Sequence, residues 1–307
     1  MTQTLLQVRD LSKRFKEREV VKGISFSINE GSCAAILGPN GAGKTTTINM
    51  LAGLLQPSGG SIELLVNGSP TMDRRPYIGF LPQMPVFYPW MTGAEFLLYA
   101  GELAGLTSHE AKKEMGEWLE AVGIWDAGKR KIGGYSGGMK QRLGLAQALI
   151  HKPKLLILDE PVSALDPTGR KDVLTLLQRI RKETTVLFST HVLHDVEEVC
   201  DEILMIRSGD IALQGSLDHV RQTYSEPVIS LEVGGDEASR SWLTAVCSKD
   251  FVIHSEISGG RAKMRVANVE QASLALMTDA VSHCIMIRSL EAGHSTLEDL
   301  FMKVVQS

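Results

Sequence analysis

The sequence lacks the cysteine patterns of zinc-binding and disulfide-rich proteins. It has only four cysteines, Cys33, Cys200, Cys247 and Cys284, which lie far apart and form no C-x-x-C pair. This spacing argues against a zinc site or a disulfide scaffold and indicates a reducing compartment. We therefore expect a cytoplasmic protein.

Long apolar runs and an excess of basic charge are also missing. No apolar run approaches the roughly 20 residues that span a bilayer, and the first residues carry no charged-then-apolar signal segment. We expect any contact with a membrane to come through a partner that supplies the span. The net charge of −4 gives no overall basic field, so we expect no nucleic-acid partner. The sequence has no internal repeats or low-complexity segments.

What is present is an ordinary globular composition, with 43% hydrophobic and 22% charged residues. The length of 307 residues suggests one large and one smaller domain. Around residue 225 the chain changes character, and Ser225-Glu226-Pro227 looks like a linker. We predict a first domain over residues 1–222 and a small α+β domain over residues 225–307. In the second we expect strands at 228–233, 251–257, 263–266 and 284–287 and helices at 271–281 and 297–305.

A glycine-rich loop at residues 38–46 fits the phosphate-loop pattern G-x-x-x-x-G-K-[ST]. It follows the apolar run 32–37, typical of a buried strand, and precedes apolar residues at helical spacing, Ile48, Leu51, Ala52 and Leu55. The glycines let backbone N–H groups converge on phosphate oxygens, and the helix N-terminus adds partial positive charge. Lys44 can reach the β- and γ-phosphates, and the Thr45 hydroxyl can bind Mg²⁺. Alone, the loop indicates only a nucleoside triphosphate.

Polar side chains end three further apolar strands. The run 155–158 ends in Asp159 and Glu160, 186–188 leads to His191, and 78–81 leads to Gln83. Because α/β proteins bind ligands at the carboxyl ends of parallel strands, we expect Asp159 to hold Mg²⁺ through water and Glu160 to polarise the attacking water. His191 can bridge the γ-phosphate and that water. Taken alone, Gln83 reads as a loop residue.

Two other features leave alternatives open. Ser136-Gly137-Gly138 opens the helical pattern that contains Leu143 and Ala146, which suits either a second phosphate site or a plain helix cap. If it is a phosphate site, it serves a ligand held by another copy of the chain. Phe15 lies between charged residues and can either stack on an adenine ring or cover a sheet edge.

Taken together, these motifs resemble the ATP-binding subunit of an ABC transporter over roughly residues 5–220. The matching segments, in order, are GPNGAGKTT at 38–46, FLPQ ending at Gln83, YSGGM at 135–139, LLILDE at 155–160, SALD at 163–166 and the switch histidine His191. The signature departs from the common pattern at Tyr135 and Met139, but Ser136, Gly137 and Gly138 are intact. The tail TLEDLFMKV looks like that of exporter-type subunits that pair with ABC-2-like permeases.

The resemblance implies an α/β fold: a P-loop NTPase core of RecA-like type with antiparallel β and α-helical subdomains, the latter at about 84–150. It implies ATP and Mg²⁺ as cofactors, Phe15 at the adenine, Thr45, Gln83 and Asp159 at the metal, and Lys44, Gln83, Glu160 and His191 as catalytic residues. The triphosphate would be held by the nine loop residues Gly38, Pro39, Asn40, Gly41, Ala42, Gly43, Lys44, Thr45 and Thr46.

The resemblance also implies partners. Two copies, or this chain and a paired subunit, would sandwich two ATP molecules head to tail, with Ser136, Gly137 and Gly138 completing the partner's site. Hydrolysis would drive export through a separate permease and hold the subunit at the cytoplasmic face of the membrane. The alternatives are an ABC ATPase with a non-transport role and a module that binds ATP without turnover. The second domain would either sense a signal or stabilise the dimer.

Overall fold

The computed structural model describes residues 3–224 and 226–306. Contacts divide the chain into two compact units, Met1–Asp218 and His219–Ser307. The predicted linker, Ser225-Glu226-Pro227, agrees with the structure only in part. Ser225 lies outside the described residues, but Pro227 already begins a strand, and the Glu226 N–H donates to Ser295 Oγ at 2.9 Å.

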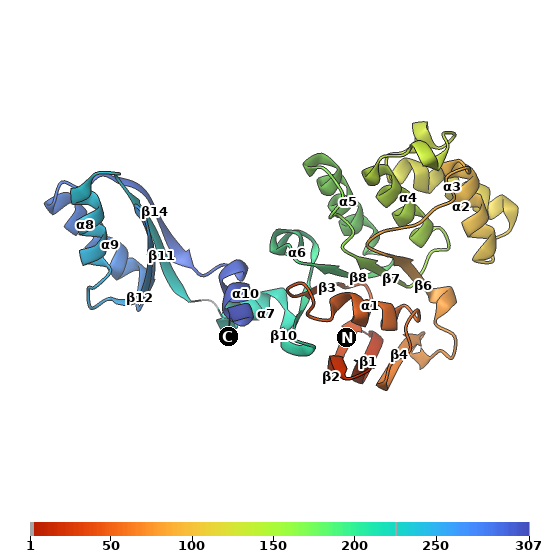
Figure 1. Cartoon of the computed structure of the whole chain (residues 1–307), viewed down its shortest axis with the longest axis horizontal. Coiled ribbons are helices and arrows are strands. Elements are labelled where there is room, and N and C mark those ends of the chain that lie inside the picture. Colours follow the sequence, from red (N-terminus) through yellow and green to blue (C-terminus); the bar gives the residue numbers. More distant parts are fainter. Residues whose placement is uncertain (1–2, 225, 307) are drawn as a thin grey trace. The chain divides into compact units, whose positions relative to one another are not determined.

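A six-stranded sheet forms the centre of the first unit (Figure 1), with strand order β10-β9-β3-β8-β7-β6. All neighbours are parallel except the β9–β10 hairpin. The inner strands are rich in apolar residues, as expected of a parallel sheet that is covered on both faces. Their bounds are β3 Cys33–Leu37, β6 Ile78–Leu81, β7 Leu155–Asp159, β8 Thr185–Thr190, β9 Glu202–Arg207 and β10 Asp210–Ser216.

The register of the parallel strands decides where the polar residues meet. Leu37 pairs with Thr190, and Asp159 pairs with Ser189. The carboxyl ends of β3, β7 and β8 therefore lie at one edge of the sheet, where the phosphate loop, the two carboxylates and His191 follow.

A second, antiparallel sheet has strand order β2-β1-β4-β5. In β2 the buried Ile24, Phe26 and Ile28 alternate with less buried polar residues, as predicted. Helix α1 joins the same apolar core as both sheets, and it lies on the opposite face of the central sheet from α5 and α6 (Figure 1). The bounds are β1 Thr4–Phe15, β2 Arg18–Asn29, β4 Gly59–Val66, β5 Ser69–Pro70 and α1 Lys44–Leu51.

Helix α1 is shorter than its apolar spacing suggests. It ends at Leu51, and Gly53 follows with a φ of 76°. Leu55 therefore lies outside the helix and packs against the core from the following loop. Glycine tolerates this backbone conformation, and such residues commonly end helices.

Helices α2 to α4 form the predicted α-helical part. Thr92 caps α2 and Thr107 caps α3, each in a capping box with the glutamate three residues later. Asp166 caps α5, whose first residue is Pro167. The bounds are α2 Gly93–Leu103, α3 Ser108–Ala121, α4 Gly137–Leu149, α5 Pro167–Ile180, α6 Leu193–Val199 and α7 Leu217–Tyr224.

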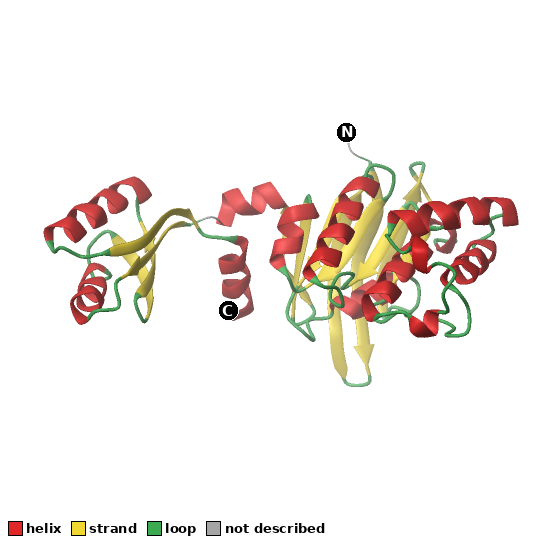
Figure 2. Ribbon diagram, turned by 90° about the horizontal axis from the view of Figure 1, so that it is seen from above, coloured by secondary structure: helices red, strands yellow, loops and turns green. Residues whose placement is uncertain are grey.

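The second unit has its own sheet, with strand order β12-β13-β11-β14, and its own apolar core. The chain order β-α-β-β-α-β is that of the ferredoxin-like pattern. Helices α8 and α9 cover the same face of this sheet (Figures 1 and 2). The bounds are β11 Pro227–Val233, α8 Glu237–Val246, β12 Val252–Ser258, β13 Arg261–Val266, α9 Val269–Ser282, β14 Ile287–His294 and α10 Leu297–Gln306.

One expectation for this unit is wrong, and one helix was missed. Residues 284–287 were expected to form a strand, but Cys284 has a left-handed backbone with a φ of 55°, and the strand β14 begins only at Ile287. Helix α8 was not predicted. Its signals were the Asp236 cap and the apolar residues Trp242, Leu243 and Val246, which are buried.

Candidate functional site

The phosphate loop connects β3 to α1, and its backbone requires glycine at two points. Gly43 has a φ of 110°, a conformation that side chains disfavour. A Cβ built on Gly38 would lie 2.3 Å from the backbone oxygen of Ile206 on β9. The loop thus packs too closely on the sheet for any side chain at this position. This is a backbone shape that fits an anion held by N–H groups.

Lys44, the first residue of α1, is buried within this loop. Its Nζ donates hydrogen bonds to the backbone oxygens of Gly38 at 2.7 Å and Pro39 at 3.2 Å. Burial lowers the pKa of the Lys44 ammonium, and the negative charges of Glu160 and Asp159 act in the opposite direction. The lysine is therefore close enough to both carboxylates to interact with them electrostatically.

Asp159 and Glu160 lie where β7 ends. Asp159 is 2% exposed and accepts a hydrogen bond from Ser189 Oγ. Glu160 is the first residue beyond the strand and has a left-handed backbone with a φ of 48°. A buried carboxylate is costly unless it is hydrogen-bonded or paired with a cation. The surroundings of Asp159 therefore suit an ionised carboxylate that binds a metal ion.

The Glu160 carboxylate is in contact with two residues that follow other strands of the sheet. His191 Nδ1 lies 3.0 Å from Glu160 Oε1. Gln83 Nε2 donates to Glu160 Oε2 at 3.4 Å. The structure thus brings together three polar residues that follow β6, β7 and β8. This is the geometry expected of a general base held between a histidine and an amide.

The other predicted site residues make their contacts elsewhere. Phe15 ends β1 and is 47% exposed, with Lys13 Nζ 5.1 Å from its ring centroid. Ser136 is exposed and accepts a hydrogen bond from the Met139 N–H at 3.2 Å, so it caps α4. Thr45 is exposed on the first turn of α1.

Two relevant contacts were missed by sequence reasoning. Ser189 bonds to Asp159 and Glu160, although sequence reasoning placed it only between the apolar run 186–188 and His191. Arg170 on α5 pairs with Asp195 on α6 at 2.6 Å. The available signal for Ser189 was a polar residue directly after an apolar run, because buried polar groups need partners. Asp195 stands among other polar residues, so no signal in the sequence indicated its burial.

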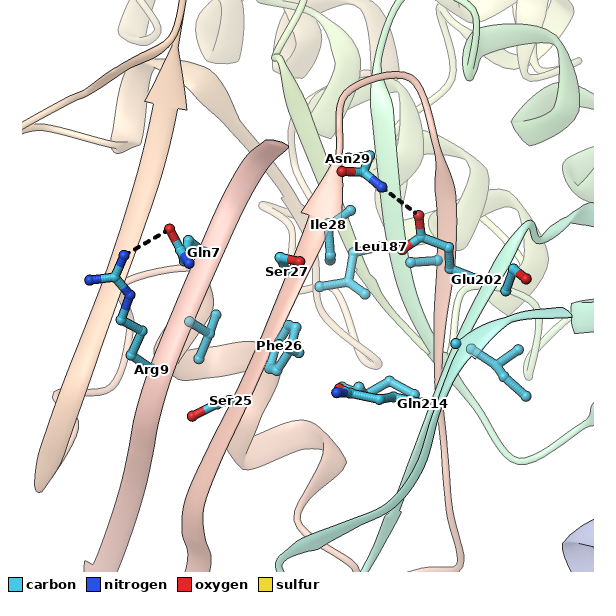
Figure 3. A pocket seen from close by; sticks show the side chains of 16 residues that line it. Gln7, Arg9, Ser25, Phe26, Ser27, Ile28, Asn29, Leu187, Glu202 and Gln214 are labelled. Atoms are coloured by element: carbon cyan, nitrogen blue, oxygen red, sulfur yellow. Dashed lines mark hydrogen bonds between the residues drawn. The ribbon is translucent and has the colours of Figure 1, made fainter. Parts of the chain in front are cut away.

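A cavity of about 670 Å³ lies away from these residues, between β1–β2 and the β9–β10 hairpin. Figure 3 shows Asn29 pointing toward Glu202 and Arg9 pointing toward Gln7, with hydrogen bonds of 3.1 Å in both pairs. Burial raises the pKa of Glu202. The cavity contains none of the predicted site residues, and several of its polar groups bond to one another.

Within residues 3–224 and 226–306, no three His, Cys, Asp or Glu side chains are grouped to bind a metal ion. The predicted magnesium ligands Thr45, Gln83 and Asp159 include one carboxylate, which suits an ion that keeps waters and takes phosphate oxygens. Over the same described part of the chain, every helix is too short or too polar to cross a bilayer.

Two family models match the chain, one in each unit. Residues 21–163 match the ABC transporter model, and residues 215–305 match the model of the C-terminal domain of DrrA1-3-like ATP-binding proteins. The first match includes the phosphate loop, Gln83, Ser136 and both carboxylates.

Curated relatives match over nearly the whole chain. The ABC transporter ATP-binding protein YxlF of Bacillus subtilis (strain 168) is 46% identical over 99% of this chain and 100% of its own length. The linearmycin resistance ATP-binding protein LnrL of the same organism is 36% identical over 98% of both chains. A solved structure of an ATP-binding subunit of an ABC transporter is 31% identical, covers 72% of this chain and 93% of its own, and has a TM-score of 0.65. The two curated relatives match over both units, and the chain therefore belongs to the family of ABC transporter ATP-binding proteins.

Proposed function

We propose that this protein hydrolyses ATP to ADP and phosphate to power export through a separate membrane permease. The observation that carries the proposal is the Glu160 carboxylate, which follows the central strand β7 and is contacted by His191 and Gln83. A carboxylate in this position can accept a proton from an attacking water, and His191 can hold the water or the γ-phosphate.

ATP fits the loop that the structure describes. The N–H groups of residues 38–46 and the Lys44 ammonium would bind the triphosphate, and the exposed ring of Phe15 would stack on the adenine. Thr45, Gln83 and Asp159 would hold Mg²⁺, the last through water. When bound, the ion would neutralise charge that develops on the phosphate oxygens.

A second copy would complete each site. Ser136 and Gly137 are exposed at the N-terminus of α4, so their backbone N–H groups and the helix dipole can face a phosphate held by another subunit. Since the γ-phosphate would contact both copies, ATP would stabilise the closed dimer and hydrolysis would reopen it. Either a homodimer or a pair with a related subunit satisfies this geometry.

The surface that follows Gln83 fits a protein partner. A groove of about 720 Å³ is lined by Phe87, Tyr88, Trp90, Phe96 and Tyr99, among others, and Trp90 is 66% exposed. Exposed aromatic clusters of this kind are typical of protein interfaces. A permease segment seated here would anchor the protein at the cytoplasmic face of the membrane and receive motion from the nearby Gln83.

The name of one relative indicates a class of cargo. LnrL is a linearmycin resistance ATP-binding protein, and we infer that this chain serves the export of an antibiotic or another small molecule. The alternative of a non-transport ABC ATPase is not favoured, because relatives that match both units are ABC transporter proteins.

The Glu160→Gln variant tests the proposal. The amide cannot accept a proton, so we expect ATP binding to persist, phosphate release to fall by at least about a hundredfold, and a closed dimer to accumulate with ATP. The measurements are phosphate release and size-exclusion chromatography with and without ATP. Glu120→Gln, on the exposed side of α3, is the matched control. Normal turnover by the Glu160 variant would contradict the proposed base.

A further inference from the structure

Ser189, the fifth residue of β8, has a hydroxyl group that faces both acidic residues of the site. It is fully buried, and its Oγ donates a hydrogen bond to Asp159 Oδ1. The same Oγ accepts a hydrogen bond from the Glu160 backbone N–H at 3.1 Å. One side chain is therefore bonded to both the predicted magnesium ligand and the predicted base.

The backbone of Ser189 makes a further contact with Glu160. The Glu160 N–H also lies 3.2 Å from the backbone oxygen of Ser189. This shared hydrogen bond holds a non-glycine residue whose φ is 48°, a left-handed conformation that side chains disfavour. Such strained residues persist only when their surroundings fix them.

The hydrogen-bond partners of the Ser189 hydroxyl group differ from those that buried serines often have. Serines in regular structure often bond to a neighbouring backbone carbonyl of their own segment. Here the donor goes to a carboxylate on the adjacent strand, and one acceptor site takes the N–H of the next residue along that strand. A hydrogen bond to a charged group is stronger than a neutral one, so it fixes the rotation of the Asp159 carboxylate.

We propose that Ser189 is a positioning residue that sets the orientation of the Asp159 carboxylate relative to Glu160. The proposal rests on the proposed ATPase function. Ser189 contacts Asp159 and Glu160, and we expect it to act by holding these two groups. Its loss would leave the loop around Lys44 intact and would disturb the metal ligand and the base together.

The experiment compares Ser189→Ala with the wild-type chain in two independent assays. We expect kcat to fall about tenfold to a hundredfold, since the lost hydrogen bonds involve a charged group and the placement of the base, with little change in KM for ATP. We expect the Mg²⁺ concentration for half-maximal turnover to rise. The second assay is thermal stabilisation by ATP with EDTA and by ATP with Mg²⁺. The EDTA shift should be unchanged, and the extra shift due to Mg²⁺ should shrink.

The matched control is Thr185→Val on the same strand. Its hydroxyl is also buried and accepts a hydrogen bond, from the Gly31 N–H at 2.9 Å, but at the opposite end of β8. We expect this variant to melt at a lower temperature and to keep the wild-type Mg²⁺ response. If Ser189→Ala behaves in the same way, Ser189 is only a packing residue and the proposal is overturned.

Two further outcomes are an unfolded Ser189→Ala variant and a wild-type chain that releases no phosphate. If Ser189→Ala does not fold, Ser189→Cys retains the size of the side chain with a weaker donor, and a full Mg²⁺ response in that variant overturns the proposal. If the wild-type chain releases no phosphate, the proposed function fails. The thermal-shift assay still tests Ser189, because it measures binding and needs no turnover.

Discussion

At the scale of single residues, His151 connects the stability of the ATP-binding unit to pH. The residue follows α4, and its Nε2 lies 3.2 Å from the backbone oxygen of Ile78. Burial lowers the pKa of His151 below its ordinary value of 6.5, and the contact with Ile78 opposes this only in part. The folded protein therefore favours the neutral ring more strongly than the unfolded chain does.

The pH dependence of stability follows from the lowered pKa of His151. Below about pH 6.5 the unfolded chain binds a proton at this position more readily than the folded one, so stability is lost as the pH falls through this range. We expect His151→Gln to lose less stability than the wild type between pH 7.5 and pH 5.5, measured by urea denaturation. His294→Gln on the exposed strand β14 is the control. Equal losses in wild type and His151→Gln would contradict the prediction.

Sequence reasoning could propose site residues where the pattern is local. The phosphate loop and the pair Asp159-Glu160 are contiguous patterns. The structure brings Glu160 into contact with His191 and with Gln83, which, taken alone, reads as a loop residue. The role of Ser189 could not be predicted, because it depends on the register between β7 and β8. A shift of one residue would turn its hydroxyl to the other face of the sheet.

At the scale of elements, the ion pair between Arg170 and Asp195 connects α5 to α6. Helix α5 follows the SALD segment at 163–166, and helix α6 follows His191. Asp195 is fully buried, and its Oδ1 lies 2.6 Å from Arg170 Nη2 and 2.7 Å from Nε. Burial raises the pKa of Asp195, and Arg170 opposes that shift. The pair thus depends on the arginine to keep the aspartate charged.

Removal of the Arg170 side chain should lower the free energy of unfolding. We expect Arg170→Ala to lower the free energy of unfolding by ~3 kcal/mol, the low end for a broken buried pair, since Arg170 remains partly exposed. Urea denaturation measures the change. Lys171→Ala, an exposed neighbour on the same helix, should stay within about 0.5 kcal/mol of wild type. An Arg170 variant as stable as the Lys171 variant would show that the pair contributes nothing.

The apolar pattern of each element decides whether it could be predicted from the sequence. β7 and β8 contain the apolar runs 155–158 and 186–188, and both strands were predicted from those runs. β14 has no fully buried residue, and it is an edge strand bonded to β11 on one side. Its period-two signal is therefore weak, and the prediction fell on the short apolar segment before it. Helix α8 was missed because its ten residues carry only a narrow apolar stripe.

At the scale of the whole molecule, each of the two units has an apolar core of its own. One core joins α1 to both sheets of the first unit, and the other lies between α8, α9 and their sheet. Every residue proposed to bind ATP lies in the first unit, whereas the match to the DrrA-like C-terminal domain begins at residue 215. Bound nucleotide should therefore stabilise the first unit alone. Packing in the second core should affect the stability of the second unit alone.

Thermal unfolding should show this separation as two transitions. Ligand that binds only the folded first unit stabilises it by ~2.7 kcal/mol at a hundredfold excess over Kd, so MgATP should raise one transition and leave the other unchanged. Met264→Ala removes a fully buried side chain from the second core, so it should lower the other transition at a cost of ~2–5 kcal/mol. Met286→Ala, at a residue that is 73% exposed, is the matched control and should change neither. A single transition that responds to both MgATP and Met264→Ala would show that the two cores unfold as one cooperative unit.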